Sequence, residues 1–282
     1  MRLAGAPQLA RKRVASDEES QQSAPSAADT DGRSVTAFIA NLNTARVTEL
    51  CIRSMRRFAG TDFHLVVGDC GSTDGSIAML ERFQRRGWLE LNVAPNGRSH
   101  AEWLDRWLRE CPTRYALFSD SDVEFSGEGW LADMVAVAQR EGAALVCGRM
   151  QHGAETFVHP VTRAERRIAP RPTAWLQLID TWQVHGRVSA NFEYVEVEDF
   201  DAFGGKIAYD TGAWYFKELR EAGLTWAEMP AEWQHKYHHF GGLTWLGPTR
   251  SGAAWRIRAR QAAKLVLIEQ RLYRARRDRW GE

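Results

Sequence analysis

Short apolar runs alternate with segments of helical periodicity from residue 35 to about residue 147. The runs are rich in β-branched or aromatic residues, as buried strands are, and predict strands at residues 35–40, 63–67, 89–93, 115–118 and 144–147. Between them, apolar residues recur at three- and four-residue steps, which predicts helices around residues 47–58, 76–86, 103–108 and 130–140. Strands that alternate with helices favour right-handed crossovers, so the pattern predicts a Rossmann-like α/β fold with a mostly parallel sheet flanked by helices.

The pattern weakens after residue 150. Residues 151–172 contain four arginines and no clear period, so we interpret them as a mobile loop region. The later elements that the sequence predicts are strands at residues 174–179 and 194–200 and a helix at residues 211–223. Gly223 suits the end of that helix.

Both ends of the chain differ from its middle in composition. Residues 1–33 are rich in Ala, Ser and Gln without any period, which is typical of a disordered tail. Residues 251–282 are strongly basic, and Leu265, Ile268 and Leu272 form an apolar stripe on a predicted helix. We therefore expect one folded domain at residues 34–250, followed by this basic helix.

Composition and charge exclude several classes of protein. The 282 residues carry a formal net charge of +1, which argues against a partner of uniform charge such as nucleic acid. The longest apolar runs fall short of the ~20 residues that a membrane-spanning helix needs, and no apolar core of a secretory signal is visible. The four cysteines form no Cys-x-x-Cys pair, which fits reduced thiols in a cytoplasmic protein.

Polar residues follow the first, second and fourth predicted strands. Because the carboxyl ends of parallel strands meet at one edge, we expect Asn41, Asn43, residues 69–74, Asp120 and Asp122 to converge on one crevice. Carboxylates as close as Asp120 and Asp122 repel each other unless they are compensated, and a hard divalent cation with oxygen ligands would compensate them. A turn rich in aspartate explains the same residues without a metal.

Four features, in this order, resemble the motifs of the family 2 glycosyltransferases of the GT-A fold. They are Asn43 after the first strand, Asp69-Cys70-Gly71-Ser72-Thr73-Asp74-Gly75-Ser76, the Asp-x-Asp motif Asp120-Ser121-Asp122, and Tyr209-Asp210 followed by His239-x-x-Gly242-x-Thr244. The resemblance covers roughly residues 34–246, and the order of the motifs makes the combination specific. Cys70 stands where the family has Asn, and Tyr209 replaces the Glu of the family's Glu-Asp pair.

The resemblance implies a nucleotide-sugar donor, usually a UDP-sugar, and Mn²⁺ or Mg²⁺ as cofactor. It implies donor binding by residues 34–150 and acceptor binding by residues 151–250. The residues assigned to the nucleotide sugar are Asn43, Asp69, Ser72, Arg98 and Asp120, with Asp69 on the base. Asp122 is the expected direct metal ligand, Asp120 a second ligand or a ribose contact, and His239 a third ligand, for which His238 is a rival. His100, beside Arg98, is a second candidate for reaching phosphate.

The resemblance further implies inversion at the anomeric carbon, which needs a base for the acceptor hydroxyl. Asp210 occupies the second position of the Glu-Asp pair and is the candidate. Capping of the following helix is an alternative role for Asp210. The nearby carboxylates that are alternative bases are Glu196, Glu198, Asp199 and Asp201.

The acceptor is not encoded in any motif; a saccharide, a glycolipid, a peptide or a small natural product remains open. Trp175, Trp182 and Trp214 are candidates for stacking on an acceptor sugar, or for core packing. Two other functions are compatible with the fold: transfer to a phosphate or lipid carrier, and non-catalytic carbohydrate binding or scaffolding. The basic C-terminal helix predicts either peripheral membrane contact or packing on the domain.

Overall fold

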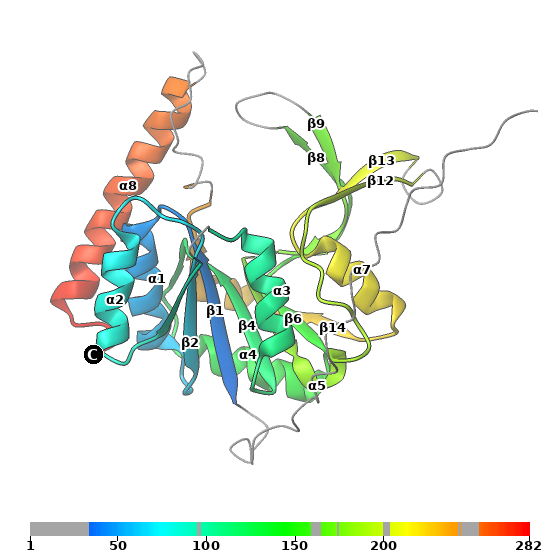
Figure 1. Cartoon of the computed structure of the whole chain (residues 1–282), viewed down its shortest axis with the longest axis horizontal. Coiled ribbons are helices and arrows are strands. Elements are labelled where there is room, and N and C mark those ends of the chain that lie inside the picture. The colour runs from blue at the N-terminus through cyan, green and yellow to red at the C-terminus, as the bar shows by residue number, and fades with distance from the viewer. Residues whose placement is uncertain are drawn as a thin grey trace, which may run out of the picture.

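The computed structural model describes residues 34–94, 97–158, 165–173, 175–199, 204–241, 243 and 254–282, with side chains in the last range described from residue 261 onward. The predicted disordered tail, residues 1–33, lies outside the described residues. Figure 1 shows a central sheet between two layers of helices, with a smaller sheet projecting beyond it and a long helix along one side.

A seven-stranded sheet forms the centre of the molecule, in the order β14-β6-β11-β4-β1-β2-β3. Its strands are β1 (Val35–Asn41), β2 (His64–Asp69), β3 (Glu90–Val93), β4 (Tyr115–Asp120), β6 (Leu145–Cys147), β11 (Leu176–Asp180) and β14 (Trp226–Glu228). β1 pairs in parallel with both β2 and β4, whereas β11 runs antiparallel between β4 and β6. The predicted mostly parallel α/β sheet is therefore confirmed, with one antiparallel strand inserted.

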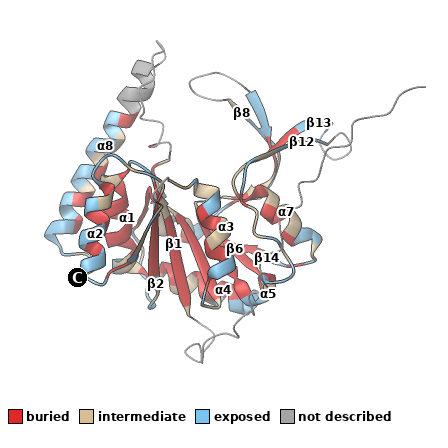
Figure 2. Ribbon diagram, in the orientation of Figure 1, coloured by how far each residue is buried: buried red, intermediate tan, exposed pale blue. Residues whose placement is uncertain are grey.

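Helices cover both faces of this sheet. They are α1 (Ala45–Phe58), α2 (Ser76–Arg85), α3 (His100–Glu110), α4 (Trp130–Glu141), the short α5 (Thr181–Val184) and α7 (Ala213–Glu221). One apolar core packs α1, α2 and α4 against the sheet, and a second packs α3 and α7 against its other face. The inner strands are buried almost throughout, as Figure 2 shows, whereas the edge strand β3 is partly exposed. The polar groups available for chemistry therefore lie in the loops at the ends of the inner strands.

Residues 151–172 contain strands, so their interpretation as a mobile loop is wrong. The strands are β7 (Met150–Gln151), β8 (Glu155–Val158), β9 (Glu165–Ile168) and β10 (Arg171–Pro172). With β12 (Val195–Asp199) and β13 (Gly205–Tyr209), β8 and β9 build the projecting sheet, in the order β12-β13-β9-β8. The sequence shows no alternation here because β8 and most of β9 bury little of either face: Glu155, Thr156 and Phe157 are all exposed.

The C-terminal helix α8 (Ala254–Arg277) packs along α1, as predicted by one of the two alternatives. Ile268 and Leu272 of the predicted stripe are buried there, while Leu265 remains 39% exposed. Buried Glu49 of α1 accepts hydrogen bonds from Arg53 and, at 2.8 Å, from Arg276 of α8. Two of the three residues of the stripe are therefore buried within the protein. Membrane contact by this helix stays a prediction.

None of the helices in the described ranges is both long enough and apolar enough to cross a membrane.

Candidate active site

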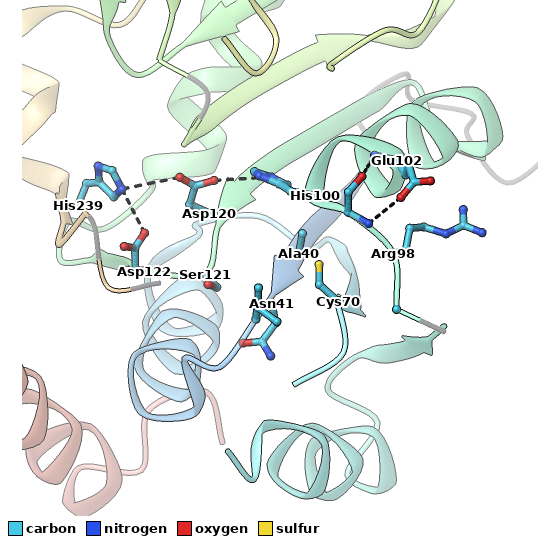
Figure 3. A pocket seen from close by; sticks show the side chains of 13 residues that line it. Ala40, Asn41, Cys70, Arg98, His100, Glu102, Asp120, Ser121, Asp122 and His239 are labelled. Atoms are coloured by element: carbon cyan, nitrogen blue, oxygen red, sulfur yellow. Dashed lines mark hydrogen bonds and ion pairs between the residues drawn. The ribbon is translucent and has the colours of Figure 1, made fainter. Parts of the chain in front are cut away.

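A cavity of about 780 Å³ lies at the carboxyl ends of β1 and β4. Its wall contains residues from five separate segments, which Figure 3 shows: Ala40, Asn41, Leu42, Cys70, Gly97, Arg98, Ser99, His100, Glu102, Asp120, Ser121, Asp122 and His239. The loops that follow β1, β2 and β4 therefore converge, as the parallel topology predicts.

Asp120, Asp122 and His239 form a compact cluster in this wall, in which one ligand atom from each lies within 4.8 Å of the others. Nε2 of His239 lies 3.1 Å from Oδ1 of Asp122 and 3.7 Å from Oδ2 of Asp120. The other oxygen of Asp120 faces Nε2 of His100 at 3.8 Å, so the carboxylate stands between two imidazoles (Figure 3).

Partial burial and the proximity of two carboxylates shift the pKa values of the cluster. Burial raises the pKa of Asp120 and the charge of Asp122 raises it further, although His100 and His239 act in the opposite direction. Burial alone would lower the pKa of His239, but its hydrogen bond to Asp122 and the charges of both aspartates leave that pKa above its ordinary value. The cluster therefore concentrates negative charge that a cation would offset.

A small strand pair brings His239 to the aspartates. β15 (Tyr237–His239), which follows the 3₁₀ helix η1 (Ala231–Lys236), pairs antiparallel with β5 (Val123–Phe125), with His239 opposite Val123. The N–H of Phe240 donates to the carbonyl of Asp122 at 3.0 Å. The indole of Trp175 stacks on the His239 ring with centroids 5.2 Å apart. The rival His238 is exposed, with its ring edge-on to Phe240, so His239 is the histidine in the cluster.

Side chains of helix α8 form hydrogen bonds and an ion pair with the same two segments. Nζ of Lys264 donates to the carbonyl of Gly241 at 2.7 Å and also to that of Phe240. Arg271 forms an ion pair with Glu124, the residue opposite His238. Helix α8 thus contacts both chain segments that carry the cluster.

The residues predicted to bind the donor divide into two groups. Arg98 and Asp120 line the cavity, and so does His100. Asn43, Asp69 and Ser72 are not among the described residues of its wall. Asp69 is 0% exposed; Oδ1 accepts hydrogen bonds from the N–H groups of Gly71 and Ser72, at 2.9 and 2.7 Å. Its contact with the base stays a prediction.

Asp210, the predicted base, lies outside the cavity wall and is paired with an arginine. Its Oδ2 is 2.7 Å from a guanidinium nitrogen of Arg171 in β10, whose charge also lowers the pKa of Asp120. Arg171 is thus in electrostatic reach of both carboxylates. The alternative of a helix cap is not supported, because Gly212 is the N-cap of α7 and Oδ1 of Asp210 accepts from Thr211.

Sequence reasoning missed two residues of the site. Asn41 lines the cavity and makes four side-chain hydrogen bonds, yet it appeared only as one of two asparagines after the first strand. Arg171 was missed because it belongs to the segment interpreted as a loop. The signal available in the sequence for Asn41 was a polar amide residue at the carboxyl end of a predicted buried strand.

The chain belongs to glycosyl transferase family 2, whose family model matches residues 36–222. The match includes both aspartates of the cluster and Asp210, and ends before His239.

Several solved structures are similar to this chain. One is mannosyltransferase PcManGT from Pyrobaculum calidifontis in complex with GDP-Man and Mn²⁺, at 18% identity and a TM-score of 0.49, covering 85% of this chain and 64% of that one. Another is S. aureus TarS 1–349, at 15% identity and a TM-score of 0.42, covering 67% of this chain and 64% of that one. TarS 1–349 in complex with UDP-GlcNAc has 18% identity and a TM-score of 0.38, covering 54% and 46%. The chain thus spans less than two thirds of their length. No curated protein matches the sequence.

Proposed function

We propose that this chain is an inverting, metal-dependent glycosyltransferase that moves a sugar from a nucleoside-diphosphate sugar to an acceptor hydroxyl. The observation that supports it most directly is the cluster of Asp120, Asp122 and His239 in the cavity wall of a family 2 chain. A volume of about 780 Å³ lies within the range of small-molecule sites, ~300–1,000 Å³. Inversion rests on the family likeness and corresponds to one in-line displacement at the anomeric carbon.

The chemistry of the cluster fits a divalent cation such as Mn²⁺ or Mg²⁺. Two carboxylates and one imidazole offer oxygen and nitrogen atoms within 4.8 Å of one another, a donor set that suits these ions. Asp122 and His239 would hold the ion directly, with Asp120 as a further ligand or a ribose contact. The bound ion would neutralise charge on the departing diphosphate.

The remaining donor contacts come from the segment that leads into α3. Arg98 and His100 lie at the start of α3, and both offer nitrogen atoms to phosphate oxygens. The Arg98 guanidinium lies over the Trp103 ring at 4.8 Å, which orients it. These two residues and the metal cluster would bind the diphosphate together, with His100 directly beside Asp120.

Asp210 is the proposed general base. Its side chain is 39% exposed in the part of the chain assigned to the acceptor. The carboxylate would accept the proton of the acceptor hydroxyl as the glycosidic bond forms. Its ion pair with Arg171 orients the carboxylate, and the charge of Arg171 also acts on Asp120.

A donor screen tests this function. Purified chain is incubated with a panel of UDP- and GDP-sugars, with Mn²⁺ or with EDTA, and nucleoside diphosphate release is measured. We expect release from one donor class with Mn²⁺ and loss of release in EDTA. The variant Asp122→Ala, which removes a proposed metal ligand, should also lose release. Its matched control is Asp62→Ala, which removes an exposed carboxylate elsewhere. Donor binding without any release, across saccharide, peptide and lipid-carrier acceptors, would instead indicate a non-catalytic binding protein.

A further inference from the structure

Asn41 occupies the junction between the two loops that carry the donor site. It is the last residue of β1, the strand that lies between β2 and β4. In the sheet register Asn41 is paired with Asp69 of β2, and its neighbour Ala40 is paired with Asp120 of β4. The side chain is 0% exposed although the residue lines the cavity, so it faces the protein beneath the wall.

The amide of Asn41 uses its full hydrogen-bonding capacity within the protein. Nδ2 donates to Oδ2 of Asp69 at 2.8 Å and to Oγ of Ser72 at 3.1 Å. Oδ1 accepts from the hydroxyls of Thr44 and Thr48, at 2.9 and 2.7 Å. The amide therefore has one orientation, because a flipped amide would turn Nδ2 toward the two threonines and Oδ1 toward a carboxylate.

The network continues from Asn41 to the Asp-x-Asp motif. The hydroxyl of Thr44 lies 3.1 Å from the hydroxyl of Ser121, the residue between the two aspartates. Thr44 and Ser121 are each 7% exposed. A continuous buried path of side chains thus joins Asp69, Asn41, Thr44 and Ser121.

We propose that Asn41 is a positioning residue, which holds the nucleotide loop (residues 69–72) and the metal-binding turn (residues 120–122) in one fixed relation. This rests on the proposed function only for the identity of the ligands. A donor that spans both loops binds well when their separation is set before it arrives, since less conformational entropy is then lost. In this role Asp69 acts through the loop that it shapes, with both oxygens bonded inside the protein.

The proposal can be tested by exchanging the two partners. In Asn41→Asp, a carboxylate faces the carboxylate of Asp69, so both loops lose their link. In Asp69→Asn, the amide keeps Oδ1 for Gly71 and Ser72 but turns Nδ2 toward Nδ2 of Asn41. In the double variant Asn41→Asp/Asp69→Asn, the amide at position 69 donates to the carboxylate at position 41. Two hydrogen bonds are reversed, because the Ser72 hydroxyl must then donate to the carboxylate at position 41, and the charge of the pair is unchanged.

Two readouts follow the exchange. Calorimetry measures the affinity for UDP and GDP with Mn²⁺, and hydrogen exchange measures protection of residues 69–72 and 120–122 without any ligand. We expect each single variant to bind nucleotide about tenfold or more weakly, the effect of losing a charge-assisted buried hydrogen bond. Protection should fall in both loops of Asn41→Asp, and the double variant should recover affinity and protection.

A separate variant tests the link to the metal-binding turn. Thr44→Val keeps the shape of the side chain and removes the hydroxyl between Asn41 and Ser121. We expect weaker Mn²⁺ binding, measured by electron paramagnetic resonance, and faster exchange at residues 120–122. Thr225→Val is the matched control, because the Thr225 hydroxyl donates to the carbonyl of Gly142 on an exposed surface.

The outcomes separate this proposal from the proposed function. If the double variant binds nucleotide as weakly as Asp69→Asn while protection recovers, Asp69 contacts the nucleotide itself and positioning by Asn41 is not what limits affinity. If exchange in Asn41→Asp rises only at residues 69–72, or Thr44→Val behaves as the control does, the two loops are not coupled and the proposal is wrong. If wild-type chain binds no nucleotide, the proposed function fails, and the exchange data still decide whether Asn41 couples the loops.

Discussion

At the scale of single residues, Asp122 should dominate metal binding. It is the carboxylate nearest to Nε2 of His239, at 3.1 Å, and its residue is 8% exposed. Asp122→Ala should weaken Mn²⁺ binding by more than about 10–100-fold, the loss typical of altering only an outer contact of a metal site. Titration with Mn²⁺, followed by electron paramagnetic resonance, measures this loss of affinity, with Asp62→Ala as control. Full turnover of the wild type in EDTA would contradict the assignment.

Asp210→Asn tests the base. Asparagine keeps the size of the side chain and an acceptor for the Thr211 N–H, and the cap of α7 is Gly212, so the fold should be retained. The melting temperature should fall only modestly, from the weakened contact with Arg171. Turnover should fall by roughly 10²–10⁴-fold, while donor affinity stays close to that of the wild type. A fall of less than about tenfold would exclude Asp210 as the base. It would favour transfer to a phosphate or lipid carrier, which needs none.

The residues differ in how far the sequence could predict them. Asp120 and Asp122 are neighbours in a motif at the end of a strand, so local sequence brings them together. His239 reaches them only through the pairing of β15 with β5, and its assignment came from the family resemblance. The partners of Asn41 and Arg171 depend on sheet register and on the position of β10, which residue type and spacing do not encode.

At the scale of elements, α8 should affect the metal cluster through Lys264. Its ammonium bonds the carbonyls of Phe240 and Gly241, directly after His239. Lys264→Met removes these bonds and keeps much of the apolar stem. We expect weaker Mn²⁺ binding with secondary structure retained, as circular dichroism would show. Lys217→Met, in the exposed Lys217–Glu221 pair of α7, is the control and should leave Mn²⁺ affinity unchanged.

The contact of α8 with α1 should make stability depend on pH. Burial alone would raise the pKa of Glu49, but hydrogen bonds from Arg276 and Arg53 outweigh it, so the pKa lies below its ordinary value of 4.5. A lowered pKa in the folded state means that the stabilisation is complete above about pH 4.5 and is lost as pH falls through the folded-state value.

Glu49→Gln should therefore cost stability at neutral pH, about 3–5 kcal/mol, because buried Arg53 loses the nearer of its anionic partners and keeps only Glu282 at 3.9 Å. The difference from wild type should shrink as pH falls below 4.5. Denaturant unfolding at pH 7 and at several acidic values measures both effects. A difference that is independent of pH would contradict the role of this carboxylate. Glu81→Gln, an exposed site on α2, is the control.

At the scale of the whole molecule, the order and type of nine of the first ten elements followed from periodicity, because each buries one stripe or both faces against the sheet. The exception is the three-residue strand β5, which is too short to show a period. The projecting sheet did not, since strands with little buried surface carry no pattern. Periodicity also does not give strand direction, so the antiparallel insertion of β11 between β4 and β6 could not be predicted. The division at residue 150 stays a functional prediction, and the central sheet crosses it.

That insertion has a consequence for synthesis on the ribosome. The strands β3, β2, β1 and β4 can pair once residue 120 has emerged, but β4 then has an open edge until β11 arrives at residue 180. At ~5–20 residues per second this stretch takes roughly 3–12 s to make. During that interval the nascent chain presents an apolar strand edge, of the kind that pairs with other chains. Chaperone dependence should therefore peak at mid-translation, between the emergence of residue 120 and that of residue 180, when the central sheet is incomplete.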